Sequence, residues 1–323
     1  MVLSLDDKWV WDSWYAKDGD TWHAFFLQAD KALGDPELRH WHVSYGHAIS
    51  RDLVRWEQLG TCFAPTEGPA WDDYTVWTGS VTRGDDGQWH LFYTGTSHAD
   101  DGKRQRLGHA VSNDLHNWER AGTGPILDID ERYEEYRKGR WHDRAFRDPW
   151  VMRDPDGDGW LMYFTARKAG VPGWLDAGAI GFATSPDLDA WTLRDPVFAG
   201  GFGELEVPQI FHREGRWYCL FCTSARFWTS AAQAIVGGAP MTGSHYLIGQ
   251  TPRGPWRIAP GPMLDGADPV KRYAGRIVDT VEGMKLMGFR WFDPKTGGFV
   301  GHIDNPVDVR VEPDGRLALV EAA

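Results

Sequence analysis

Hydrophobic and polar positions follow a pattern that occurs five times along the chain. Each copy has an acidic residue followed by glycine and then a run in which aromatic or apolar residues predominate. The five pairs are Asp18-Gly19, Asp86-Gly87, Asp158-Gly159, Glu214-Gly215 and Glu282-Gly283. A glycine turn followed by a short apolar run is typical of two β-strands joined by a tight connection. The spacing of roughly 60 to 70 residues indicates a repeat architecture.

A second pattern follows the first within each of the first three units. It consists of a short alternating run, then Ser-x-Asp-Leu, and a tryptophan three residues after the leucine. The copies are Ser50 to Trp56, Ser112 to Trp118 and Ser185 to Trp191, and a weaker fourth copy runs from Gln250 to Trp256. Each unit therefore contains further strands separated by a polar turn.

Five such units predict an all-β fold, a five-bladed β-propeller with a central active-site funnel. Because the units fill residues 1–323, we expect one catalytic domain and no C-terminal β-sandwich. The charged segment 130–138 is expected to form at most one or two helical turns within a loop. We expect four strands in each blade and almost no helix elsewhere. The innermost strands of the blades line the channel, so residues far apart in the sequence converge at its mouth.

Composition excludes several classes of protein. The net charge of −12 argues against binding of a nucleic-acid backbone. The longest apolar runs fall short of the roughly 18 residues of a membrane span. Residues 1–9 lack a basic start followed by an apolar run, so we expect no signal peptide and a cytoplasmic protein. The 19 tryptophans exceed the usual content, and we expect most to pack between sheets and two or three to stack on sugar rings.

Three acidic residues stand among apolar neighbours near the start of a blade: Asp12, Asp148 and Glu206. A carboxylate in such surroundings is costly unless it is paired or functional. Each by itself is equally well explained as a turn or cap residue. Their similar placement in what we take to be three successive blades favours a shared site.

Two carboxylates are the chemistry of glycoside hydrolysis: one attacks the anomeric carbon and the other protonates the leaving oxygen. Glu204 and Glu206 are two residues apart on an expected strand and so face the same side. One of them would be the acid, with a raised pKa, while the other would hold sugar hydroxyls and help to keep it protonated.

Several motifs resemble those of glycoside hydrolase families 32 and 68, the invertases, fructanases and levansucrases. Trp11-Asp12-Ser13-Trp14 is similar to the nucleophile motif of family 68. Arg147-Asp148-Pro149 resembles the Arg-Asp-Pro motif of both families, and Trp77-Thr78-Gly79-Ser80 resembles a shared sugar-pocket motif. Glu204-Leu205-Glu206 resembles the acid/base segment of family 68. The resemblance runs from Trp9 to about Trp228 and fades after that.

The resemblance implies a role for each matching residue. Asp12 would be the nucleophile, Asp148 the transition-state stabiliser and Glu206 the acid/base. The substrate-binding residues would be Trp11, Trp77, Thr78, Arg147, Glu204 and Arg226, the last on the acceptor side.

The chain also departs from the two families. The Asn-Asp-Pro start of family 32 is absent, and its Glu-Cys-Pro motif reads Glu206-Val207-Pro208. A calcium ligand that precedes the acid/base segment in some levansucrases is Gly203 here. The segment Asp154 to Gly159 imitates a calcium loop, but its twelfth position is Thr165 instead of glutamate, so we expect a tight turn. We expect neither a metal nor a cofactor.

These observations favour a retaining β-fructofuranosidase that hydrolyses sucrose or short fructo-oligosaccharides. The alternatives are a fructosyltransferase of the levansucrase type, a propeller hydrolase for another furanoside such as an arabinofuranoside, and a non-catalytic sugar-binding propeller. The expected partner is a small-molecule sugar. Hydrolysis is expected to dominate over transfer, with Arg226, Phe227 and Trp228 as candidates for part of an acceptor pocket.

Overall fold

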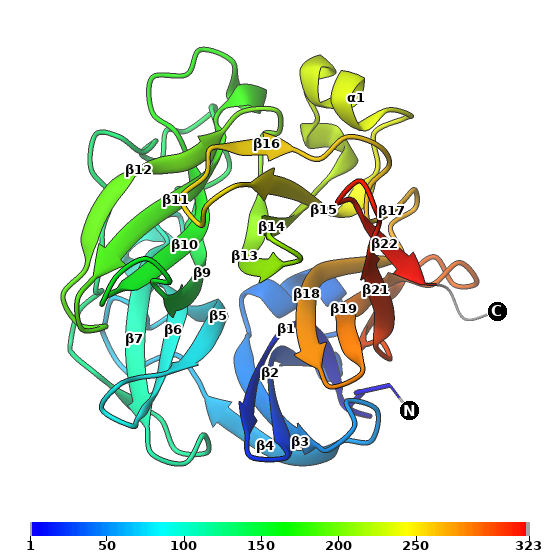
Figure 1. Cartoon of the computed structure of the whole chain (residues 1–323). Helices are drawn as coiled ribbons and strands as arrows, with labels where there is room; N and C mark the ends of the chain where they lie inside the picture. Colours follow the sequence, from blue (N-terminus) through cyan, green and yellow to red (C-terminus); the bar gives the residue numbers. More distant parts are fainter. Residues whose placement is uncertain (1, 321–323) are drawn as a thin grey trace.

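A computed structural model describes residues 2–320, which form five antiparallel sheets around a central channel (Figure 1). The first blade contains β1 (Lys8–Asp18), β2 (Thr21–Asp30), β3 (Ser44–Ser50) and β4 (Glu57–Phe63). The second contains β5 (Thr75–Arg83), β6 (Trp89–Thr96), β7 (Arg106–Ser112) and β8 (Glu119–Arg120). The third contains β9 (Phe146–Arg153), β10 (Trp160–Arg167), β11 (Gly178–Ser185) and β12 (Thr192–Ala199). This confirms the propeller prediction.

The last two blades each carry a fifth short strand beyond the four expected. The fourth blade has β13 (Glu206–Arg213), β14 (Arg216–Thr223), β15 (Thr242–Gly249) and β16 (Trp256–Ile258), and β17 (Asp265–Ala267) also pairs with β15. The fifth has β18 (Arg272–Thr280), β19 (Gly283–Phe292), β21 (Val307–Val311) and β22 (Leu317–Val320), and β20 (Phe299–Ile303) pairs with β19. The added strands are possible because β15 and β19 each pair with two partners in turn along one edge.

Helical segments are short. One α-helix, α1 (Ser230–Val236), begins after Thr229, whose hydroxyl accepts the amide of Ala232 at 3.1 Å. The 3₁₀ turns are η1 (Lys31–Leu33), η2 (Pro36–His40), η3 (His98–Asp100), η4 (Trp174–Asp176) and η5 (Ala225–Phe227). Segment 130–138 forms turns and extended chain instead of a helical turn, because its backbone bonds outward: the amide of Glu134 donates to the carbonyl of Arg167 at 2.8 Å.

The acidic-glycine pairs occupy the connection between the first and second strand of every blade, as the repeat predicted. Gly87 has φ +81°, which side chains disfavour. At Gly159 there is no room for a side chain, because a Cβ atom would lie 2.5 Å from the carbonyl oxygen of Ser185.

The Ser-x-Asp-Leu copies form one turn geometry three times. In the second blade the Ser112 hydroxyl accepts the amides of Asp114 and Leu115 at 3.2 and 2.9 Å. The leucine then adopts a positive φ and buries its side chain; its φ is +60°, +65° and +73° in the three copies, Leu53, Leu115 and Leu188. Burial of the leucine offsets the strain of this backbone conformation.

The ring closes between the first and last blades without a shared strand. Strands β1–β4 come from the start of the described chain and β18–β22 from its end, and Leu3 exchanges backbone hydrogen bonds with Ile303 at 3.1 and 3.0 Å. Residues of both blades pack in one hydrophobic cluster, which includes Val10, Phe289 and Ile303. Among residues 2–320, no helix has the length and apolar character needed to cross a bilayer.

Candidate active site

The innermost strand of every blade is irregular at the same level of the channel. The pairing register shifts at the residues that follow Trp11, Trp77, Arg147, Glu206 and Tyr273. Four residues at these breaks have positive φ: Asp12, Asp148, Val207 and Ala274. Bulges of this kind re-aim side chains, and here they turn the end of each inner strand toward the channel.

The acidic residues come from blades one, three and four, so the expectation of three successive blades is wrong. In blade two the position equivalent to Asp12 and Asp148 holds Thr78, and in blade five the position equivalent to Glu206 holds Tyr273. Both lie beside carboxylates. The hydroxyl of Thr78 donates a hydrogen bond to Asp12, and that of Tyr273 donates one to Glu206. The blades without an acid therefore supply hydroxyl donors to the acids of the others.

All nine residues predicted for the site line one cavity with a volume of about 770 Å³. They are Trp11, Asp12, Trp77, Thr78, Arg147, Asp148, Glu204, Glu206 and Arg226. Eight lie within the channel, whereas Arg226 is exposed at the rim. The cavity therefore brings together residues that are up to about 200 positions apart in the sequence.

Arg147 is the central cation of the cavity. Its Nη2 donates to Glu204 and, at 2.8 Å, to Oε1 of Glu206. Its Nη1 donates to Gln105 at 3.1 Å, and its Nε lies 3.5 Å from Asp148. One buried guanidinium thus fixes two of the predicted acids and Glu204 in a single network.

Asp12 is partly open to the cavity but is otherwise surrounded by protein. Burial raises its pKa to about 6, against the opposing effect of the Thr78 hydroxyl, and the nearby Glu206 raises it further. At neutral pH the carboxyl is mostly ionised and so is able to act as a nucleophile.

Asp148 is buried more deeply, with 3% of its surface exposed. It accepts hydrogen bonds from the Thr165 hydroxyl at 2.8 Å and from the Val207 amide at 3.3 Å. Burial raises its pKa to about 7, although Arg147 opposes the shift. The carboxyl is held rigidly in a position that faces the cavity.

The pKa values of Glu204 and Glu206 are shifted in opposite directions. Burial and the charge of Glu206 raise the pKa of Glu204 to about 8. Burial also acts on Glu206, but Arg147 and the hydrogen bond from Tyr273 outweigh it and lower the pKa of that carboxyl. A raised pKa was expected for Glu206, as the acid, but the residue with the raised pKa is Glu204. Glu204 also precedes β13 instead of lying on it; the two carboxyls meet through Arg147, not through strand alternation.

Sequence reasoning missed several residues that line the cavity. Tyr273 had a usable signal, because it lies about ten residues before the acidic-glycine turn of its blade, much as Glu206 does in the fourth. Arg39 had none, because it lies in the irregular turn η2. It is 1% exposed, with its guanidinium 4.0 Å from the ring centre of Phe299. The other cavity residues that were not predicted include Gln105, His142, Asp143, Tyr273 and Trp291.

His40 and Trp41 also line the cavity. The segment from Asp154 to Gly159 is an interstrand turn closed by a backbone hydrogen bond of 2.9 Å. Trp228 is buried and donates to the carbonyl of Met241, so it does not join Arg226 at the rim. Within the part of the chain that the structure describes, His, Cys, Asp and Glu side chains form no group of three placed to bind a metal.

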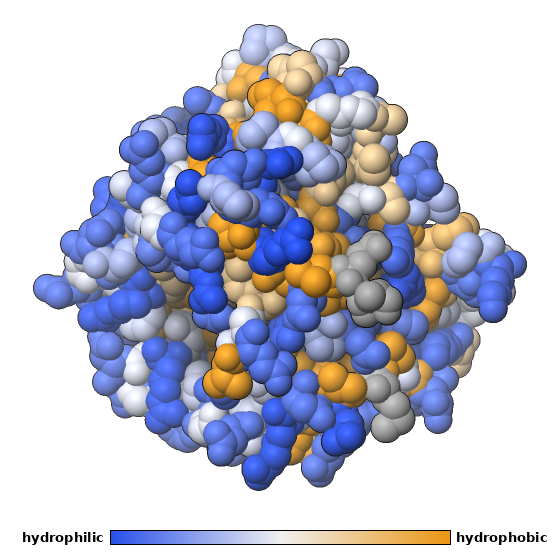
Figure 2. Space-filling view, turned by 45° about the vertical axis from the view of Figure 1, so that its right-hand side comes forward, coloured by the Kyte–Doolittle hydropathy of each residue, from blue (hydrophilic) through white to orange (hydrophobic). Residues whose placement is uncertain are grey.

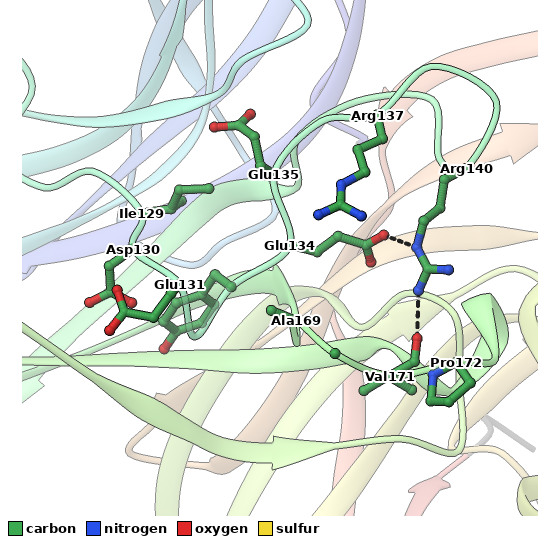
Figure 3. Close-up of a pocket in the computed structure, with 12 residues that line it drawn as sticks. Ile129, Asp130, Glu131, Glu134, Glu135, Arg137, Arg140, Ala169, Val171 and Pro172 are labelled. Carbon is green, nitrogen blue, oxygen red and sulfur yellow. Dashed lines mark hydrogen bonds and ion pairs between the residues drawn. The ribbon is translucent and has the colours of Figure 1, made fainter.

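A second cavity, of about 640 Å³, lies between the loop before β9 and the β10–β11 loop (Figure 3). Asp130, Glu131, Glu134 and Glu135 are among its lining residues, and Glu134 points toward Arg140, with which it forms an ion pair. None of the three predicted catalytic acids lines it. On the face in Figure 2, hydrophilic residues predominate and hydrophobic ones form separate small groups. The central cavity is thus the site with clustered chemistry.

A five-bladed propeller with buried carboxylates around an arginine in its channel defines a propeller enzyme of the glycoside hydrolase type. The chain belongs to the family described as glycosyl hydrolases family 32 N-terminal domain, whose model matches residues 14–277. This match confirms the resemblance read from the motifs and extends it into the fifth blade.

Two curated relatives and one solved structure illustrate the family. The extracellular sucrase of Zymomonas mobilis is 25% identical, over 97% of this chain and 84% of that protein. The invertase of Kluyveromyces lactis is 25% identical, over 64% of this chain, and the match spans only 34% of that protein. A levansucrase structure from Bacillus subtilis has a TM-score of 0.78 at 17% identity, and the match covers 99% of this chain and 88% of that chain. The structural likeness concerns the fold.

Proposed function

We propose that this protein is a retaining β-fructofuranosidase that hydrolyses sucrose or short fructo-oligosaccharides. The observation that carries the proposal is the convergence of Asp12, Asp148 and Glu206 in one cavity of a family 32 propeller. A non-catalytic sugar-binding propeller would be expected to have lost at least one of these acids.

In the proposed mechanism, a carboxylate oxygen of Asp12 attacks the anomeric carbon of the fructosyl unit. The bond to the leaving sugar breaks, and Glu206 gives its proton to the leaving oxygen. Water then attacks the anomeric carbon of the ester, and Glu206 takes a proton from it. Fructose leaves and the Asp12 carboxylate is restored. Asp148 accepts hydrogen bonds from sugar hydroxyls as positive charge develops on the ring.

The electrostatics constrain this assignment. In the sugar-free cavity the pKa of Glu206 is lowered and that of Glu204 is raised, so in the proposed mechanism the Glu204 side supplies the proton that Glu206 donates. The two carboxyls contact the same Nη2 atom of Arg147 and titrate as a coupled pair. A separation of about 5 to 5.5 Å between the carboxyls of Asp12 and Glu206, as retaining enzymes have, stays a prediction.

The test is incubation with sucrose and measurement of free glucose and fructose. Asp12→Asn should lower turnover by at least about 10³-fold while the protein remains folded, because the lost group acts in the chemical step. Near-normal activity of that variant would rule out the nucleophile assignment. Equal glucose and fructose at high sucrose supports hydrolysis, whereas excess glucose with new oligosaccharides would make the protein a fructosyltransferase.

A further inference from the structure

The channel contains a further cavity beyond the catalytic acids, which the proposed reaction does not use. This lower cavity has a volume of about 170 Å³. Its wall takes residues from the inner strands β1, β9, β13 and β18, a few positions along each strand from the catalytic cavity (Figure 1). They include Trp14, Trp150, Gln209 and Arg276. None of the described residues that line the lower cavity also lines the catalytic one, so the two are separate spaces in one channel.

Arg276 places a buried positive charge in the wall of the lower cavity. The residue is 1% exposed, and burial lowers its pKa to about 10, so the guanidinium is charged at neutral pH. Its Nη1 donates to the carbonyls of Val207 and Pro208 at 3.1 and 2.7 Å. Within residues 2–320, no carboxylate lies within ion-pair distance of it. A buried cation with only carbonyl partners is costly unless a counter-charge lies nearby.

Four N–H donors on the wall of this cavity have no acceptor among residues 2–320. They are Nε and Nη2 of Arg276 and the indole Nε1 atoms of Trp14 and Trp150. The guanidinium of Arg276 also lies 5.4 Å from the ring centre of Trp150, and Trp14 is 1% exposed. Buried donors are normally paired, so four on neighbouring side chains indicate a ligand that accepts hydrogen bonds.

The acceptors of the wall are already in use. The side chain of Gln209 donates to the carbonyl of Ile277 at 2.8 Å and accepts its amide at 2.6 Å. The hydroxyl of Tyr15 is bonded to that of Ser13 at 2.7 Å. A water molecule that accepts two of the free donors must also place two hydrogens, for which this wall offers little. A small anion accepts from every side and also compensates the charge of Arg276.

The size and the opening of the lower cavity suit such an ion. Its volume equals the share of about five or six water molecules in the liquid, which is enough for one small ion with part of its hydration. Trp22 and Asp279 line it and contact solvent, so an ion reaches it from the face opposite the catalytic mouth. Asp279 lies 3.5 Å from Arg213, which reduces its repulsion of an anion.

We propose that the lower cavity is a binding site for a small monovalent anion such as chloride. Arg276 holds the ion, and the indole N–H groups of Trp14 and Trp150 donate to it. The site goes beyond the proposed function, and its occupancy is measured without any sugar.

The affinity for the anion should depend on pH through the acids that share Arg276 with it. The titratable groups that face this guanidinium are Asp12, Tyr15, Asp148 and Cys222. Burial raises the pKa of Tyr15 and Cys222 far above neutrality, whereas it raises that of Asp12 to about 6 and that of Asp148 to about 7. Both carboxyls are therefore largely neutral at about pH 5.5 and ionised at about pH 8, so the anion should bind more tightly at the lower pH. Reciprocally, a bound anion raises the pKa of both acids.

The test is the line width of the chloride NMR signal, titrated with sodium chloride at about pH 5.5 and at constant ionic strength in sodium gluconate. Exchange with the site should broaden the line of the wild-type sample, and Arg276→Gln should weaken chloride binding by at least about tenfold. Arg257→Gln is the matched control, because it removes an exposed cation from β16, and it should bind as the wild type does. Absence of broadening in the wild type, or equal binding by Arg276→Gln, would overturn the site.

A milder variant keeps the test decisive if Arg276→Gln does not fold. Trp150→Phe retains an aromatic ring but loses one donor, and it should weaken chloride binding about threefold to tenfold. Trp56→Phe, at a half-buried tryptophan outside the cavity, should have no effect. Equal effects of these two substitutions would contradict the assigned donors. Repetition at about pH 8 should show weaker binding, and binding as tight as at about pH 5.5 would refute the ion as the counter-charge of Arg276.

Discussion

At the scale of single residues, the cavity sets the protonation of its acids by burial and by one arginine. Burial raises the pKa of Asp12 to about 6 and that of Glu204 to about 8, while Arg147 holds that of Glu206 low. In the proposed reaction, Asp12 would therefore be ionised at a pH at which Glu204 still holds its proton. Sequence reasoning predicted both acids of the pair but not the distribution of charge between them, which depends on the contacts of Arg147 and Tyr273.

The pH dependence of kcat/KM should be bell-shaped. Activity should fall as the pH drops through about 7 and then 6, because Asp148 must be ionised to stabilise positive charge and Asp12 must be ionised to attack. It should also fall as the pH rises through about 8, because the proton of the Glu204 and Glu206 pair is lost. Initial rates at low sucrose over this range check the prediction. A profile that is flat through pH 6 contradicts the state assigned to Asp12.

Substrates with a good leaving group should distinguish the acid from its partner. An aryl fructoside needs little protonation of its leaving oxygen, so Glu206→Gln should lose at least about 10²-fold on sucrose but much less on the aryl compound. Glu204→Gln should lose similar factors on both, because it holds the sugar and positions Arg147. If the two variants exchange these patterns, Glu204 is the acid, as its raised pKa alone would indicate.

At the scale of elements, the repeated patterns could be recognised in the sequence, whereas the bulges could not. The acidic-glycine pairs and the Ser-x-Asp-Leu copies lie at connections that recur from blade to blade, and their positions were predicted correctly. The breaks after Trp11 and Glu206 were not predicted, because a bulge is a local irregularity of pairing with the neighbouring strand. The geometry of the Glu204 and Glu206 pair was misread because Glu204 precedes β13, so strand alternation does not relate the two side chains.

The Ser-x-Asp-Leu turns should contribute to stability individually. The Asp114 carboxylate accepts the amides of His116 and Asn117, both at 2.8 Å, and these bonds lower its pKa. Asp114→Ala should cost about 1 kcal/mol of unfolding free energy, since two amides lose their acceptor to water. Chemical denaturation measures this cost. Asp20→Ala, in an exposed turn, serves as the control and should be near neutral; equal effects at the two positions would contradict the turn's contribution.

At the scale of the whole molecule, the count of five blades and the single ring followed from the repeats, while the fifth strands and α1 did not. The loops before β9, after β10 and after β14 border the rim of the cavity, and no periodic pattern encodes their lengths and contacts. The blades also differ in their interfaces. Blade one places His23 beside His47, with their nitrogens 3.0 Å apart, and blade two repeats this arrangement. Blade three has Leu161 and Phe182 at the equivalent positions.

These buried histidines should make the ring sensitive to acid. Burial lowers the pKa of His47 to about 3 and also lowers that of His23. Unfolded histidine takes up a proton near pH 6.5, so below that value the unfolded chain binds more protons and stability falls with the pH. Replacement of both by the pair of blade three, His23→Leu with His47→Phe, should reduce the loss of Tm between about pH 7 and pH 5. The same loss in both proteins would contradict this.

Each blade is built from consecutive strands, yet the cavity takes residues from all five. A nascent chain is therefore able to complete blade after blade during synthesis without possessing a working site. The last essential contact arrives when β18 places Tyr273 against Glu206 and the segment around Ile303 meets Leu3. Measured turnover should therefore indicate that the ring of blades has closed. Spectroscopic signals of strand formation do not detect this closure.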